Sequence, residues 1–203
     1  MSLFGQDSYD KQLNLLPYDG EANYLGPVMT AAESERYYSA LLANIAWQAD
    51  QAVIFGKTIT TKRKYAWYAN EAYSYTYSKI VRTALPWTTE LLELKALVEE
   101  QSSEAFNSCL LNLYHTGEEG MAWHSDGEKE LTKHGTVASL SFGAERKFAF
   151  KHKQTKDVVA LNLAAGSLLL MKGVTQDHWL HRLPTTKKIH EPRINLTFRK
   201  MNA

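Results

Sequence analysis

The stretch that most constrains this chain of 203 residues lies near its C-terminus, at residues 193–199, which read Arg-Ile-Asn-Leu-Thr-Phe-Arg. Polar and apolar residues alternate strictly, which predicts a β-strand with one polar and one apolar face. The polar face holds only hydrogen-bond donors and no acid: Arg193, Asn195, Thr197 and Arg199. Guanidinium groups bind carboxylates through paired hydrogen bonds. The strand therefore predicts a site for a small dicarboxylate, with a solvated edge strand as the alternative.

A second pattern consists of metal-ligand residue types. His124 and Asp126 are two positions apart, so in an extended segment their side chains point the same way. His181 follows later, twelve residues before Arg193. Two histidines and one carboxylate on one face of a metal leave three open positions, which is the ligand set of non-haem Fe(II) oxygenases. Catalytic Zn²⁺ takes the same ligand types, so a hydrolase remains an alternative. His178 is a competing third ligand.

Asn112 and Tyr114 end an alternating run that begins at Phe106 and predicts a buried strand. They share one face of that strand, and both donate hydrogen bonds to carboxylates. Their alternative role is that of buried polar groups satisfied by the backbone.

Taken in order, these motifs resemble those of the AlkB-type Fe(II)/2-oxoglutarate dioxygenases, in particular the members that repair double-stranded DNA. The resemblance runs from about Val53 to the C-terminus. It implies iron bound by His124, Asp126 and His181. It also implies 2-oxoglutarate held by five residues: Asn112, Tyr114, Arg193, Asn195 and Arg199. Of these, Arg193 is expected to bind the distal carboxylate and Arg199 to lie nearer the metal.

The activity implied is oxidative demethylation of N1-methyladenine and N3-methylcytosine in DNA. The reaction uses Fe(II), O₂ and 2-oxoglutarate and releases formaldehyde, succinate and CO₂. The expected substrate contacts are a base held between Tyr77 and His124, with Tyr75 and Glu128 at its edge. The family has a second acidic residue after the ligand aspartate, where this chain has Gly127. The missing side chain is expected to affect which methylated base the enzyme prefers.

Nucleic-acid binding is also indicated by the residues themselves. Six aromatic residues lie between Tyr65 and Tyr77, and aromatic faces stack on bases. Phe55, in an apolar run at an expected hairpin tip, is a candidate wedge that replaces a flipped base. Arg63 and its lysine neighbours are candidates for phosphate contacts, as is a second basic stretch from Arg146 to Lys156. Core packing and solvated strand faces are the alternatives.

The fold expected is mainly β with some helix (α+β): a double-stranded β-helix, or jelly roll, with two supporting N-terminal helices. One helix is predicted after a capping box at Thr30–Glu33 and the other after Thr88. Strands are predicted at 106–115, 135–142, 147–152, 157–163, 167–172 and 193–200, with strands and hairpins over 50–82. Residues 1–29 are expected to be irregular. We expect one domain over 1–203, with an N-terminal extension (1–105) and a catalytic core (106–203).

The composition sets limits on partners and compartment. A net charge of +1 means that any DNA-binding surface is local. A single cysteine, Cys109, is expected to be a buried thiol in a reducing compartment. With no signal peptide or membrane span expected, we predict a soluble intracellular monomer, cytoplasmic if bacterial and nuclear if eukaryotic. Two alternatives remain: the same chemistry on RNA, protein or lipid, and a non-catalytic jelly-roll metal-binding module.

Overall fold

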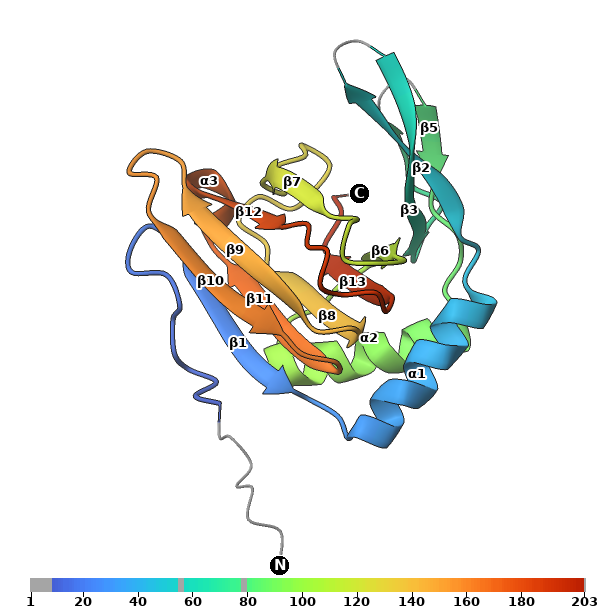
Figure 1. Ribbon diagram of the computed structural model, residues 1–203, viewed down its shortest axis with the longest axis horizontal. Helices are drawn as coiled ribbons and strands as arrows, with labels where there is room; N and C mark the ends of the chain where they lie inside the picture. Colours follow the sequence, from blue (N-terminus) through green and yellow to red (C-terminus); the bar gives the residue numbers. More distant parts are fainter. Residues whose placement is uncertain (1–8, 55–56, 78–79, 203) are drawn as a thin grey trace, which may run out of the picture.

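The computed structural model describes residues 9–54, 57–77 and 80–202, and the side chains of residues 51–59 and 74–82 are also outside this description. Two antiparallel sheets face each other, and two long helices cover the outer side of the larger one (Figure 1). This is the jelly-roll arrangement predicted from the sequence. None of the helices in the described part of the chain is long and apolar enough to cross a bilayer.

The major sheet has seven strands in the order β1-β11-β8-β13-β6-β3-β2, the minor sheet has the order β10-β9-β12-β7, and β4 pairs with β5. The elements have the following bounds: β1 Glu21–Pro27, α1 Ala31–Asn44, β2 Gln48–Ile54, β3 Lys57–Ala69, β4 Ser74–Tyr77, β5 Ile80–Thr83, α2 Thr89–Ser102, β6 Ser108–Tyr114, β7 Met121–His124, β8 Val137–Gly143, β9 Arg146–His152, β10 Val158–Leu163, β11 Ser167–Lys172, α3 Thr175–His178, β12 Trp179–Leu183 and β13 Arg193–Arg199.

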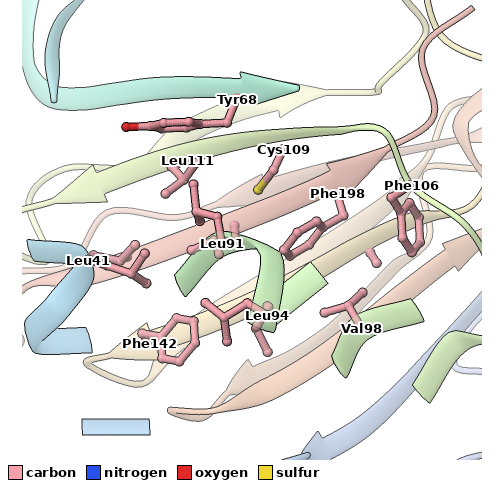
Figure 2. Close-up of a cluster of buried hydrophobic side chains, with 14 of the residues drawn as sticks. Leu41, Tyr68, Leu91, Leu94, Val98, Phe106, Cys109, Leu111, Phe142 and Phe198 are labelled. Atoms are coloured by element: carbon pink, nitrogen blue, oxygen red, sulfur yellow. The ribbon is translucent and has the colours of Figure 1, made fainter. Parts of the chain in front are cut away.

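The main core lies between the two helices and the major sheet (Figure 2). Leu91, Leu94 and Val98 of α2 are fully buried against aromatic residues of the sheet, among them Phe142 and Phe198. The predicted capping box starts α1: the Glu33 amide donates to Thr30 Oγ1, and the Thr30 amide donates to the Glu33 carboxylate. Burial of these apolar side chains is the main force that holds the helices on the sheet.

The alternation in β13 separates this core from the functional side of the sheet. Ile194, Leu196 and Phe198 are fully buried under the helices. The opposite face, which carries Arg193 and Arg199, points into a cavity between the two sheets. The polar face is therefore not turned to solvent, and the alternative of a solvated edge strand is wrong, because β13 lies between β8 and β6.

Each of the six strands predicted after residue 105 is present, with ends that differ by at most two residues. The expectation of an irregular segment over 1–29 is wrong for residues 21–27, because β1 forms the edge of the major sheet by pairing with β11. The short strands β7 and β12 and the four-residue α3 were not predicted. Strands from both sides of residue 105 share the major sheet.

Arg146, expected in a basic surface stretch, is instead 1% exposed. Its guanidinium donates to the backbone carbonyls of Thr116, Gly117, Glu119 and Pro184 at 2.9–3.3 Å. A buried arginine needs such acceptors because its N–H groups are otherwise left without partners. Arg146 therefore joins the segment before β7 to the segment after β12 and is not part of a DNA-binding surface.

Candidate metal centre and anion pocket

Pairing between β7 and β12 brings the two predicted histidine ligands together. His124 is the last residue of β7, and it lies directly opposite His181 of β12 in the sheet register. Their ring centroids are 4.2 Å apart. Asp126 follows β7 and completes a group of three ligand atoms that all lie within 4.8 Å of one another. The structure therefore brings together the His-x-Asp pair and His181, although 57 positions separate His124 from His181 in the chain.

The protonation states of the three side chains suit a divalent metal. Burial acts to raise the pKa of Asp126, but Arg199 and the two histidines outweigh it and lower the pKa to about 2. Burial lowers the pKa of His181 to about 3, so its ring is neutral at neutral pH. His124 Nδ1 lies 2.9 Å from the carbonyl oxygen of Ala122, which fixes its proton on Nδ1 and leaves the Nε2 lone pair for a metal.

Arg199 holds the carboxylate of Asp126. Its Nε and Nη2 both donate to Asp126 Oδ2, at 3.2 and 2.8 Å. The sequence led us to expect Arg199 as a 2-oxoglutarate contact near the metal. In the structure its described contact is with the predicted metal ligand, so Arg199 orients that carboxylate and keeps it ionised.

Arg193 is a buried cation without an anionic partner among the described residues. It is 2% exposed, and Nη2 donates to Ser141 Oγ at 2.9 Å and to Asn195 Oδ1 at 2.7 Å. Its Nε is buried and has no hydrogen-bond partner. Burial lowers the pKa of Arg193 to about 10, so the side chain is still charged at neutral pH. A buried, charged and incompletely paired guanidinium is the feature expected of an anion site.

The other predicted 2-oxoglutarate contacts surround Arg193. Asn112 and Tyr114 of β6 are buried, and the Arg193 guanidinium lies 5.7 Å from the centroid of the Tyr114 ring. Asn195 accepts from Ser139 Oγ at 2.9 Å as well as from Arg193, so its carbonyl oxygen is already used within the protein. Ser139 and Ser141 of β8 were not predicted as site residues. They are two positions apart on β8 and pair with Thr197 and Asn195 of β13, so their side chains lie on the same face of the sheet as the predicted contacts.

The three candidate metal ligands line one cavity of about 250 Å³ together with Arg193, Arg199, Asn112, Tyr114, Ser139 and Asn195. Its walls also contain Tyr65, Glu128 and the ion pair formed by Asp50 and Arg63. Because the metal group and the buried arginine open into the same space, one bound 2-oxo acid can contact both.

The predicted substrate contacts have different outcomes. Phe55 lies outside the described residues, and Tyr75 and Tyr77 are described only through the pairing of β4 with β5. Glu128 is exposed and lines the cavity. Arg63, expected to contact phosphates, has a side chain that is only 14% exposed and is paired with Asp50. Arg63 instead faces the cavity, and Asp50 was not predicted at all.

His178, the competing ligand, belongs to a second group with Asp19 and His152, whose ligand atoms also lie within 4.8 Å of one another. His152 is 1% exposed, and its Nδ1 accepts a hydrogen bond from the Thr155 amide at 3.1 Å. A neutral His152 therefore carries its proton on Nε2, the atom 3.5 Å from Asp19 Oδ2. That proton occupies the position a metal would need, so the second group is not a prepared metal site.

The chain was compared with known families and proteins. The model of the 2OG-Fe(II) oxygenase superfamily matches residues 22–199. DNA oxidative demethylase ALKBH2 of Mus musculus is 39% identical over 173 residues, covering 81% of this chain and 70% of that protein. The Homo sapiens protein of that name is 38% identical, with 81% and 64% covered. Alpha-ketoglutarate-dependent dioxygenase alkB homolog 3 of Bos taurus is 37% identical over 177 residues, with 82% and 61% covered.

Two solved structures share the fold at low sequence identity. OsALKBH1 has a TM-score of 0.61 at 15% identity and is covered over 98% of its length by 91% of this chain. A 2OG-Fe(II) family oxidoreductase from Burkholderia pseudomallei has a TM-score of 0.60 at 13% identity, with 91% of this chain and 87% of that one covered. With the site geometry and the sequence relatives, these findings show that the chain belongs to the 2OG-Fe(II) oxygenase superfamily, and within it to the AlkB-type enzymes.

Proposed function

We propose that the chain removes methyl groups from N-alkylated bases in DNA, of the N1-methyladenine and N3-methylcytosine type, by oxidation with Fe(II), O₂ and 2-oxoglutarate. The products are formaldehyde, succinate, CO₂ and the unmodified base. The observation that carries the proposal is that the His124–Asp126–His181 group opens into the same cavity as Arg193, a buried cation for which the described residues supply no anion. The choice of DNA as substrate follows the names of the ALKBH2 relatives, which are called DNA oxidative demethylases. This chain spans 60–70% of the mouse, cow and human ALKBH2 proteins.

The residues fit iron and 2-oxoglutarate. His124 Nε2, Asp126 and His181 hold the metal, and Arg199 keeps the Asp126 carboxylate ionised and oriented. Arg193 binds the distal carboxylate of 2-oxoglutarate, Asn195 and Ser141 orient Arg193, and Asn112 and Tyr114 complete the wall. When bound with 2-oxoglutarate and O₂, Fe(II) supplies the oxidation of the N-methyl carbon. The protein contributes position, charge and exclusion of water.

The methylated base enters from the Glu128 side of the cavity. N1-methyladenine and N3-methylcytosine carry a formal positive charge, which the Glu128 carboxylate attracts. Among the described residues Glu128 has no ion-pair partner, so its charge is available to a substrate. Tyr77 and His124 hold the base between them, Tyr75 contacts its edge, and Phe55 fills the space the base leaves in the duplex. Lys62 and Lys64, both exposed, contact phosphates.

A direct experiment incubates the protein with Fe(II), 2-oxoglutarate and oligonucleotides that each carry one N3-methylcytosine. Single-stranded DNA, double-stranded DNA and RNA of the same sequence are compared. We expect each DNA lesion to lose the mass of one methylene group and one succinate to form per lesion, with no loss for His124→Ala. Succinate formation that leaves the lesion intact in every nucleic acid would move the substrate to another class. We expect a monomer acting in an intracellular compartment, which sedimentation and localisation test separately.

A further inference from the structure

The charged groups that line the cavity form an almost complete set of pairs. Three arginines and three carboxylates face it: Arg63, Arg193, Arg199, Asp50, Asp126 and Glu128. Arg199 is paired with Asp126 at 2.8 Å, and Arg63 is paired with Asp50. Two groups have no ion-pair partner within the described part of the chain: Arg193, assigned to the dicarboxylate, and Glu128, assigned to the cationic base. The pair formed by Asp50 and Arg63 has no role in the function proposed above.

This pair forms part of the cavity wall next to the metal-bearing strand. Asp50 of β2 is 3% exposed, and its Oδ2 accepts from Arg63 Nε of β3 at 3.1 Å. Arg63 Nη1 donates to the sulfur of Met121 at 3.0 Å, and Met121 begins β7, which ends in His124. The Arg63 guanidinium also lies 5.9 Å from the Tyr114 ring centroid. The pair therefore connects the hairpin of β2 and β3, which extends away from the helices in Figure 1, to the strand that carries His124.

The geometry points to Asp50 as a specificity-determining residue that neutralises Arg63 and so lets the cavity accept a positively charged base. The inference rests on the proposed function. An unpaired arginine in the wall of a partly desolvated cavity repels a cationic base strongly, because charge interactions are weakly screened there. Paired with Asp50, the same arginine presents almost no net charge, and Glu128 is left to attract the substrate.

The inference separates two kinds of methylated base by their charge. Methylation at N1 of adenine or N3 of cytosine produces a cation, whereas methylation at N3 of thymine or N1 of guanine replaces an N–H proton and leaves the base neutral. A binding site often discriminates between ligands of different charge by repelling one of them. If Asp50 sets the charge of the cavity wall, its removal changes the preference between these classes more than it changes turnover of the neutral class.

The test measures kcat/KM for N3-methylcytosine and for N3-methylthymine in otherwise identical oligonucleotides, which gives a ratio that is independent of enzyme concentration. Asp50→Asn keeps the shape and one acceptor but removes the charge, and we expect the ratio of cationic to neutral lesion to fall about tenfold. Arg63→Met leaves Asp50 unneutralised, and the ratio should rise. The double variant Asp50→Asn with Arg63→Met removes both charges, and its ratio should return to within about twofold of the wild type.

The outcomes distinguish this inference from the proposed function. If the wild type demethylates neither lesion, the proposed function fails and the inference fails with it. If the wild type acts on the lesions but Asp50→Asn leaves the ratio unchanged, Asp50 does not set specificity while the demethylase assignment stands. A purely structural role of the pair predicts equal losses on both lesions and no recovery in the double variant. If one of the single variants does not fold, the direction in which the other changes the ratio of kcat/KM values still tests the inference.

Discussion

Two groups of two histidines and one aspartate occur in the described part of this chain, and only one is prepared for a metal. In the first, His124 Nδ1 faces the Ala122 carbonyl, so Nε2 offers a lone pair. In the second, His152 Nδ1 accepts the Thr155 amide, so Nε2 holds a proton. The same residue types at similar mutual distances therefore differ in which nitrogen is available. The backbone group on the far side of each ring decides the difference.

The surroundings differ as well. Asp126 is buried and paired with Arg199, whereas the side chain of Asp19 is 53% exposed. The first group opens into the cavity that contains Arg193, and none of the three residues of the second group lines it. Ligand identity and distance alone thus do not define a metal site, because the protonation state and the neighbouring charge also have to be correct.

The largest expected effect comes from removing ligands of the first group. His124→Ala and Asp126→Ala should each lower Fe(II)-dependent succinate formation by more than about a hundredfold, exceeding the loss seen when an outer partner is removed. The matched control is His178→Ala in the second group, which should change turnover less than about twofold. Calorimetric titration of the metal-free protein should give one site. A loss of activity in His178→Ala, or a second metal site that this substitution abolishes, would show that the second group also binds metal.

Arg193 gives the next largest effect. Arg193→Met removes charge-assisted hydrogen bonds, so the dissociation constant of 2-oxoglutarate should rise about 10- to 100-fold. Binding of a 2-oxo acid that lacks the distal carboxylate should be almost unchanged. Arg182→Met, which alters an arginine stacked on Trp123 at 4.4 Å, is the control. Equal losses for both acids would place Arg193 at the metal end of the cosubstrate.

Arg199 tests whether the pairing of Asp126 matters. Arg199→Gln removes the charge that keeps this carboxylate ionised, and we expect Fe(II) affinity to fall about tenfold, at the lower end of the range for groups that orient a metal ligand. The loss should grow as the pH is lowered, because the pKa of Asp126 is no longer held down. An Fe(II) affinity equal to that of the wild type at pH 6 would show that the ion pair has no influence on the metal.

A further prediction concerns the stability of the metal-free protein as a function of pH. The pKa of His181 is about 3 in the folded state and 6.5 without burial, so the unfolded chain takes up this proton first as pH falls. The resulting stability is full above pH 6.5 and declines towards pH 3, with a slope of about 1.4 kcal/mol per pH unit at most for one proton. Urea unfolding at several pH values compares the wild type with His181→Gln. Parallel curves for the two proteins would contradict a buried neutral ring.

Much of the fold followed from local patterns. The strands β8, β9, β10, β11 and β13 carry clear periodicity or turn signals, and the capping box located the start of α1. β7 and β12 contain only four and five residues, too few for a periodic signal. β1 follows Pro17 and Gly20 and itself ends in Gly26 and Pro27, and its partner β11 lies 140 or more positions away. Such pairings depend on tertiary contacts that a local pattern does not contain.

The candidate site divides in the same way. Residue type and order predicted the two histidines, Asp126, Arg193 and Arg199 as site residues, because few side chains suit that chemistry. The structure lines one cavity with all five. Asp50, Ser139 and Ser141 were not predicted, since each acts through a polar side chain on a neighbouring strand. Asp50 and Ser141 accept from an arginine, and Ser139 donates to Asn195. Arg63 and Arg146 were assigned to surfaces because a run of basic residues does not reveal which of its members turns inward.

Arg146 has a consequence for how the metal is acquired. Its guanidinium binds carbonyls on both sides of the site, before β7 at Gly117 and Glu119 and after β12 at Pro184. These are the strands that carry His124 and His181. The distance between the two imidazoles is therefore set by the polypeptide before any ion arrives. Metal binding should therefore leave the backbone around His124 and His181 nearly unchanged, and the empty and filled proteins should differ in stability by the free energy of metal binding alone.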